Sequence, residues 1–161
     1  MIFVVVGTQG PFDRMIRAVD QWAVENNRYD VFAQIGRGAW RPTRLKWVEH
    51  LGAEEFAACL QRADILVSHA GMGTILTALE LSKPILVMPR RAALHEQRND
   101  HQVATARKLE ELGLANVAKD EGELIERLRN LDRLKVGNRA GTEELGRLLE
   151  TIRRFLVEPG N

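Results

Sequence analysis

The chain has 161 residues, of which 45% are apolar and 28% are charged, and its net charge is +1. This composition is typical of a globular protein with one core, and the balanced charge gives no reason to expect nucleic-acid binding. The single cysteine, Cys59, excludes an internal disulfide, and no apolar stretch approaches the length of a membrane span.

The first segment, "MIFVVVGTQG", has an apolar run from Ile2 to Val6 that ends at Gly7. A short run rich in β-branched residues predicts a strand that is buried on both faces. The run has no basic residues before it and is too short for the core of a signal peptide. We therefore expect a cytoplasmic protein with no transmembrane segment of its own.

The remaining elements follow from the spacing of apolar residues, which recur every three or four positions in helices and form short runs in buried strands. The expected helices cover residues 12–23, 56–60, 103–112, 124–131 and 145–155, with a further helix that begins at 71–73, carries apolar residues to 79 and ends before Pro84. The expected strands cover 31–35, 45–48, 65–67, 85–88 and 115–118. This alternation predicts an α/β protein with a single Rossmann-like domain over residues 1–161, in which a parallel sheet carries helices on both faces.

Two glycine turns stand where a strand passes into a helix. Gly7-Thr8-Gln9-Gly10 follows the first strand, and His69-Ala70-Gly71-Met72-Gly73-Thr74 follows the strand over 65–67. Helix N-termini have free N–H groups and a partial positive charge, and glycine lets an anion approach them. Two such turns in one sheet indicate a diphosphate site, although each turn alone is also explained by tight chain geometry.

Several phosphate-binding and metal-binding classes are disfavoured. The loop after the first strand lacks the G-x-G-x-x-G fingerprint of dinucleotide cofactors, and the P-loop pattern is absent. His95 and His101 do not have the spacing of helix metal ligands, and there is no cysteine cluster. We expect neither a metal nor a cofactor, and a sugar nucleotide is the remaining candidate.

Two stretches, "VGTQGPFDRMIRAVD" and "ADILVSHAGMGTILTALELSKPILVMPRRAALHEQRNDHQ", resemble the donor-binding, C-terminal half of GT-B glycosyltransferases of the family 28 type. The chain looks most like the stand-alone small subunits of two-component UDP-sugar transferases, such as the eukaryotic dolichol-linked UDP-GlcNAc transferase and the bacterial exopolysaccharide and capsule pairs. The resemblance implies a Rossmann-like domain that binds a UDP-sugar.

The resemblance also implies roles for the residues of the second glycine turn. Gly71, Met72 and Gly73 would face the diphosphate, with Thr74 adding a hydroxyl or capping the helix. His69 would contact a phosphate or the sugar and is a weak candidate for a catalytic residue. From the first turn, Gly7, Thr8 and Gln9 would approach the donor sugar from the opposite side.

Other positions match the family pattern less closely. Thr77 stands where related transferases carry the carboxylate that holds the ribose, and Glu80, one helical turn later, is the alternative. In "NDHQ", His101 and Gln102 match positions that bind sugar hydroxyls, whereas Asn99 binds the ligand or caps the helix. Arg90 and Arg91 would neutralise the diphosphate or pair with a uronic acid, unless they are solvated loop residues.

A complete GT-B enzyme has two Rossmann-like domains, so the resemblance implies that the acceptor site and the general base lie elsewhere. We expect the donor-binding subunit of an inverting glycosyltransferase that moves a hexose, uronic acid or N-acetylhexosamine to a lipid-linked saccharide. A membrane-anchored partner subunit would recruit it to the cytoplasmic face of the membrane. The loop with Arg37, Trp40, Arg41, Arg44 and Trp47 and the helix over 145–156 are the docking candidates.

Other readings stay open at this point. The chain in isolation is a possible homo-oligomer. A non-catalytic UDP-sugar sensor is one alternative function, and an enzyme that resembles UDP-sugar 2-epimerases is another. The identity of the sugar does not follow from the sequence.

Overall fold

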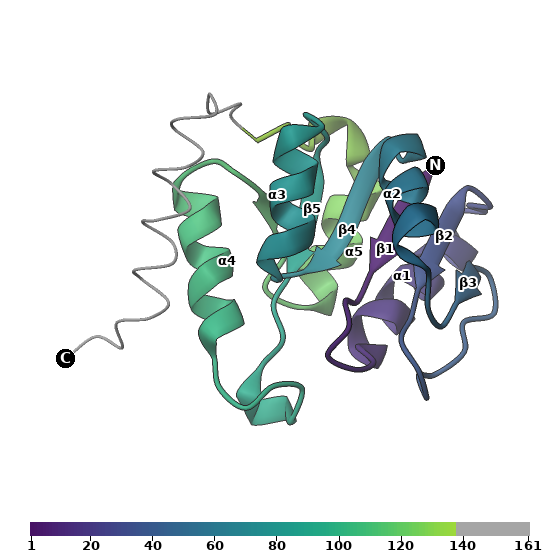
Figure 1. Cartoon of the computed structure of the whole chain (residues 1–161), viewed down its shortest axis with the longest axis horizontal. Helices are drawn as coiled ribbons and strands as arrows, with labels where there is room; N and C mark the ends of the chain where they lie inside the picture. The colour runs from purple at the N-terminus through teal and green to yellow at the C-terminus, as the bar shows by residue number, and fades with distance from the viewer. Residues whose placement is uncertain (138–161) are drawn as a thin grey trace.

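Six strands form one parallel sheet in the order β3-β2-β1-β4-β5-β6 (Figure 1). The computed structural model describes residues 1–137 of the chain. The strands are β1 (Ile2–Val5), β2 (Val31–Gln34), β3 (Lys46–Val48), β4 (Ile65–His69), β5 (Ile85–Met88) and β6 (Asn116–Val117). Each strand runs parallel to its neighbours, as the alternation of elements along the chain predicts.

Helices cover both faces of the sheet, as Figure 1 shows. The helices are α1 (Asp13–Glu25), α2 (Ala53–Arg62), α3 (Met72–Glu80), α4 (His101–Glu111) and α5 (Glu121–Arg129), with 3₁₀ turns at η1 (Ala92–Leu94) and η2 (Leu131–Arg133). α2, α3 and α4 lie on one face, and α1 and α5 lie on the other. The predicted fold class, a Rossmann-like sheet with helices on both faces, is confirmed.

Alternate residues of the central strand β1 serve the two cores. Phe3 and Val5 pack toward α2, α3 and α4, whereas Ile2 and Val4 pack toward α1 and α5. The burial of every β1 side chain explains why its sequence is a continuous apolar run. Phe3 also stacks on Phe32 of β2, with 5.8 Å between the ring centroids.

The expected element boundaries differ from the observed ones at two places that matter. Helix α4 begins at His101, so Asn99 and Asp100 precede it, and α5 ends at Arg129, so Leu131 lies in η2. The expected helix over 145–155 lies outside the described residues. Over the range that the structure describes, no helix combines the length and hydropathy that crossing a membrane requires.

The sheet order reverses direction at β1 and β4, which lie side by side. Val5 of β1 pairs in register with Ser68 of β4, so the turns that follow these two strands begin at the same edge of the sheet. In open parallel sheets this switch point, beyond the carboxyl ends of the strands, is where ligands bind. The topology therefore places the two glycine turns at a common site.

The loop between β2 and β3 is anchored to α1 by a buried carboxylate. Asp20, which is 4% exposed, accepts hydrogen bonds from the N–H groups of Thr43, Arg44 and Leu45 and from the Thr43 hydroxyl. Burial alone would raise the pKa of Asp20, but these hydrogen bonds outweigh burial and hold its pKa below the ordinary value. The side chain therefore stabilises the fold most in its charged form.

We expect Asp20→Asn to lower the free energy of unfolding by about 1–2 kcal/mol at neutral pH, because an amide replaces a charged acceptor. A lowered pKa stabilises the fold above the ordinary carboxyl pKa, and this contribution is lost as the pH falls through the pKa of the folded state. Urea unfolding of both proteins at about pH 7 and about pH 2 measures this, and the difference should vanish in acid. Asp13→Asn is the control, because Asp13 accepts from the Trp40 N–H in the same loop. If Asp13→Asn lowers the free energy of unfolding as much as Asp20→Asn does, the anchoring role of Asp20 is contradicted.

Candidate functional site

A cavity of about 830 Å³ lies at the carboxyl edge of the sheet, over the switch point. Its wall combines the turns after β1 and β4 with the first residues of α2, α3 and α4. Most of the residues predicted for the site line it: Gly7, Thr8, Gln9, His69, Gly71, Met72, Gly73, Thr74, Thr77, His101 and Gln102. The structure therefore gathers three separate sequence segments around one space.

The N-terminus of α3 opens into this cavity without a side-chain cap. Its N-cap residue is Gly71, which has no side chain to accept from the first N–H groups, and Thr74 is the third residue of the helix rather than its cap. A Cβ built on Gly73 would have no heavy atom within 4 Å. Main-chain N–H groups at the positive end of a helix, with open space in front, form an anion-binding arrangement.

Helix α2 also reaches the cavity, but its N-terminus is already occupied. The N–H of Gly52 donates to the Glu55 carboxylate at 3.0 Å, and Glu54 and Glu55 place two negative charges in the first turn. An anion is repelled there and favoured at α3, where the first turn holds no acidic residue. The cavity is therefore electrostatically asymmetric.

The glycines beside His69 have a different role from the one that the sequence predicts. A Cβ on either Gly7 or Gly71 would lie within 3.0 Å of the His69 imidazole. Gly7 also has a φ of +79°, which favours glycine. These two glycines leave room for the His69 ring between the two turns, and Gly73 is the one that keeps the space in front of α3 open.

His69 itself is 9% exposed and lies at the end of β4, with Nδ1 3.4 Å from the Ser68 hydroxyl oxygen. Burial, followed by the positive charge of Arg90, lowers the pKa of His69 from 6.5 to about 4. The ring is therefore neutral at physiological pH and can donate or accept a hydrogen bond. Such a low pKa makes it a weak general base.

Because the imidazole is neutral in the folded chain, the stability of the protein should fall as the pH drops from 6.5 toward about 4. In that window the unfolded chain takes up a proton at His69 and the folded chain does not, so acid favours unfolding. NMR titration of the ring and urea unfolding across this range test the expectation, with His69→Gln as the variant that lacks this pH dependence. An imidazole that titrates near its ordinary pKa in the folded chain would contradict it.

The start of α4 supplies the other polar groups that the sequence predicts. His101 and Gln102 line the cavity, and Gln102 accepts a hydrogen bond from the Arg90 N–H at 3.1 Å. Asn99 does not line the cavity; its side chain accepts from the His101 N–H, so it stabilises the start of the helix. Of the two roles considered for Asn99, the geometry favours the structural one.

The prediction that Arg90 and Arg91 enter the crevice is wrong for both side chains. Arg90 is 2% exposed, and its guanidinium donates to the carbonyls of Val6, Gly10 and Pro11 beneath the first glycine turn. Arg91 reaches away to the Lys119 carbonyl. Main-chain carbonyls attract both guanidiniums, so neither charge enters the cavity, although the positive charge of Arg90 still acts on His69.

Thr77 and Glu80 also separate in space. Thr77 lines the cavity and donates its hydroxyl to the Gly73 carbonyl at 3.1 Å. Glu80, the last residue of α3, is exposed and lies outside the cavity wall. The geometry therefore favours Thr77 over Glu80 as the residue closer to a ligand.

Sequence reasoning missed one side of the cavity. The segment between β3 and α2 contributes His50, Leu51 and Gly52, and the first turn of α2 contributes Ala53 and Phe56. Further polar residues come from β2, the β5–α4 loop and α4, namely Gln34, Gln97 and Thr105. The sequence carries a signal for this side, because His50 lies just beyond the carboxyl end of a strand, the place where ligands bind in parallel sheets. Among the described residues, no lysine or arginine lines the cavity, and no group of three or more His, Cys, Asp or Glu is arranged to hold a metal ion.

Comparison with known proteins gives consistent results. The model of the glycosyltransferase family 28 C-terminal domain matches residues 1–144. The human UDP-N-acetylglucosamine transferase subunit ALG13 is 31% identical over 128 residues, which are 70% of this chain and 10% of that protein. A Geobacillus kaustophilus UDP-N-acetylglucosamine--N-acetylmuramyl-(pentapeptide) pyrophosphoryl-undecaprenol N-acetylglucosamine transferase is 41% identical over 98 residues, or 58% of this chain and 26% of that protein. The chain thus spans a small part of the curated relatives that it matches.

Solved structures agree on the fold. The NMR structure of ALG13 has a TM-score of 0.64 at 23% identity and covers 94% of this chain and 96% of its own. The crystal structure of Acinetobacter baumannii MurG has a TM-score of 0.59 at 17% identity and covers 96% of this chain and 49% of its own. On the match that covers residues 1–144, the chain belongs to the glycosyltransferase family 28 C-terminal domain family.

Proposed function

We propose that this chain, as one domain over residues 1–161, is the donor-binding subunit of a two-component inverting glycosyltransferase. It binds a UDP-sugar and works with a partner that holds a lipid-linked saccharide acceptor at the cytoplasmic face of a membrane. Because the relatives are UDP-N-acetylglucosamine transferases, UDP-N-acetylglucosamine is the first donor to test among the UDP-linked hexoses, uronic acids and N-acetylhexosamines.

The observation that carries this proposal is the uncapped N-terminus of α3 in the wall of the cavity. The diphosphate accepts hydrogen bonds from the main-chain N–H groups of Met72, Gly73 and Thr74. In the transition state the leaving diphosphate gains negative charge, which preorganised N–H groups and the helix dipole stabilise more strongly than in the ground state. No lysine or arginine among the described lining residues competes for this task.

The rest of the donor is placed on either side of the diphosphate. Leu51 and Phe56 offer apolar surface for the uracil, and Thr77, one turn into α3, lies near the ribose. Gln9, His101 and Gln102 supply hydrogen-bond donors and acceptors for the sugar hydroxyls. Neutral His69 donates or accepts a hydrogen bond at the diphosphate or the sugar and is not the general base.

The general base and the acceptor site are assigned to the partner. The acceptor hydroxyl must lose a proton as the sugar moves, and the weakly basic His69 is a poor group for that step. The chain alone is therefore expected to bind the donor but not to transfer it.

Calorimetry of the chain with UDP, UDP-N-acetylglucosamine, UDP-glucose and UDP-glucuronate tests the proposal. UDP and at least one UDP-sugar should bind the isolated chain. Transfer from that sugar to a lipid-linked acceptor should appear on membranes only after co-expression with the partner. A chain that binds none of these compounds, or that transfers the sugar at a normal turnover rate by itself, contradicts the proposal.

A further inference from the structure

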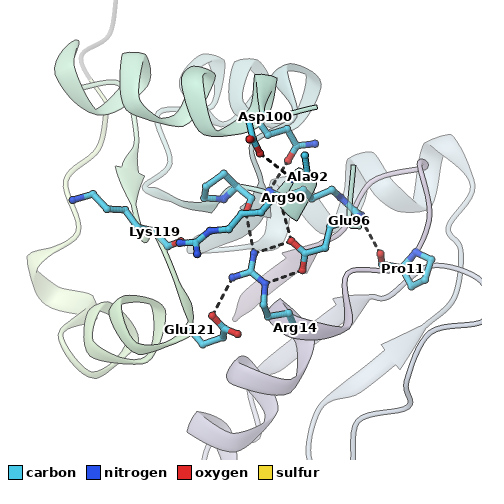
Figure 2. A network of polar contacts seen from close by, with 11 residues as sticks. Pro11, Arg14, Arg90, Ala92, Glu96, Asp100, Lys119 and Glu121 are labelled. Atoms are coloured by element: carbon cyan, nitrogen blue, oxygen red, sulfur yellow. Dashed lines mark hydrogen bonds and ion pairs between the residues drawn. The ribbon is translucent and has the colours of Figure 1, made fainter. Parts of the chain in front are cut away.

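Two loops that line the cavity are tied together beneath it by a network of polar contacts (Figure 2). One is the β1–α1 loop, residues 6–12, and the other is the β5–α4 loop, residues 89–100. The first supplies Gly7, Thr8 and Gln9 to the cavity wall, and the second supplies Gln97 and leads directly into His101 and Gln102. The spacing between these loops therefore sets the width of the cavity on this side.

Arg14 of α1 and Glu96 form the centre of the network. Arg14 Nε donates to Glu96 Oε1 at 2.7 Å, and Arg14 Nη2 donates to Glu96 Oε2 at 2.8 Å, so the guanidinium holds both carboxylate oxygens. The side chains are 13% and 14% exposed, so water screens this ion pair only partly. Neither residue lines the cavity.

Both members of the pair also hold the main chain of the β5–α4 loop. Arg14 donates to the Pro89 carbonyl at 3.1 Å, and Glu96 accepts from the Arg91 N–H at 3.0 Å. The pair thus fixes the loop at its first residues and at Glu96. The residue before Glu96, His95, has a φ of 55°, a left-handed conformation that a non-glycine residue keeps only where its surroundings impose it.

The β1–α1 loop is joined to the β5–α4 loop by two sets of hydrogen bonds. In the first, the buried Arg90 guanidinium donates to the carbonyls of Val6, Gly10 and Pro11. On the cavity side, Gln97 Nε2 donates to Gln9 Oε1 at 2.7 Å, and both of these residues line the cavity. Gln97 directly follows Glu96 in the chain, so moving Glu96 moves this bridge.

We propose that Arg14 and Glu96 are positioning residues for the donor site. Their two-point contact sets the conformation of the β5–α4 loop, and through it the places of Gln97 and His101 in the cavity wall. The inference rests on the proposed function, because it assumes that the cavity binds the donor. The pair would thus affect donor binding although neither side chain lines the cavity.

Binding of a UDP-sugar to the full chain tests this inference, because His101, and Gln9 through its bridge to Gln97, are assigned to the sugar hydroxyls. The binding is measured by calorimetry, with the UDP-sugar that binds the unmodified chain most tightly, at a temperature where every variant is folded. We expect Arg14→Met and Glu96→Gln each to weaken UDP-sugar binding about tenfold and to change UDP binding less. Arg14→Lys should be intermediate, because an ammonium keeps the charge but not the two-point geometry. The double variant should bind no more weakly than the single variants, since the two side chains act as one unit.

A matched control is the exposed pair of Arg129 and Glu25, 2.9 Å apart, which joins α5 to α1 away from the cavity. Glu25→Gln should leave the UDP-sugar affinity unchanged. As a second measurement, the amide NMR signals of Gln9, which is bridged to Gln97, and of His101 should shift in Glu96→Gln and not in Glu25→Gln. This measurement uses only the Glu→Gln substitutions, which keep the shape of the side chain, so it can be made even if Arg14→Met does not fold.

The outcomes separate the two proposals. If the unmodified chain binds a UDP-sugar and both Arg14→Lys and Glu96→Gln bind it within twofold of that affinity, the positioning inference is overturned and the proposed function stands. If the unmodified chain binds no UDP-sugar, the proposed function is overturned and the inference falls with it.

Discussion

Gly73→Ala is expected to weaken UDP binding by about 10- to 100-fold while the fold remains as stable as before or becomes more stable. Gly73 is the second residue of α3, and a Cβ there would meet no protein atom within 4 Å. Alanine favours a helix over glycine by about 1 kcal/mol, so folding does not oppose the change. The new methyl group instead occupies the space through which the diphosphate reaches the N–H groups of the helix. Each charge-assisted hydrogen bond lost there is worth about 1.5–3 kcal/mol.

The matched control for Gly73→Ala is Gly122→Ala. Gly122 is likewise the second residue of a helix, α5, but it lies away from the cavity. Calorimetry should give unchanged UDP affinity for this control. Its new Cβ would lie 3.3 Å from Oδ1 of Asp120, the capping residue of α5, so thermal unfolding should show the control to be the less stable of the two variants. If Gly73→Ala binds UDP as tightly as the unmodified chain, the diphosphate does not lie in front of α3.

Gly71→Ala is expected to lower the free energy of unfolding by about 1–3 kcal/mol and to disrupt the cavity, as overpacking does in a protein interior. The backbone is not the obstacle, because Gly71 has a φ of −94°, which alanine adopts readily. The obstacle is the His69 imidazole, which would lie within 3.0 Å of the new Cβ and would be displaced toward the cavity that it lines. The ring must leave its place between the two glycine turns.

A double variant separates this collision from other causes. His69→Ala removes the ring, so Gly71→Ala should cost far less stability in that background than in the unmodified chain. Urea unfolding of the four proteins gives the coupling between the two positions. Additive effects, with no coupling, would mean that His69 does not occupy the space beside Gly71.

The fold of residues 1–137 could be predicted almost completely from the sequence, for a physical reason. Strands such as Ile2–Val5 and Ile85–Met88 are buried on both faces, so their sequences are continuous apolar runs that glycine or proline interrupts. Alternation of such runs with helical spacing leaves few arrangements other than a parallel sheet. The weaker points were at helix ends, where Leu131 continues the apolar spacing of α5 but lies in a 3₁₀ turn.

The part of the candidate site that follows from local sequence is the part that main-chain geometry defines. Glycine turns after strands place the backbone at the switch point, whatever the side chains do, and Gly71 and Gly73 line the cavity there. Arg90 shows the limit of the method. Its position after β5 is as expected, but three carbonyls of a distant loop determine where its guanidinium points. The contact of Arg14 with Glu96, 82 positions apart, leaves no local pattern in the sequence.

The central claim is that main-chain N–H groups at the start of α3 bind the diphosphate of an activated sugar. Amide NMR spectra of the isotope-labelled chain, recorded while UDP is added, test it directly. We predict that the signals of Met72, Gly73 and Thr74 move the most and saturate with the same dissociation constant that calorimetry gives. Saturable UDP binding that leaves these three amides unmoved would contradict the account.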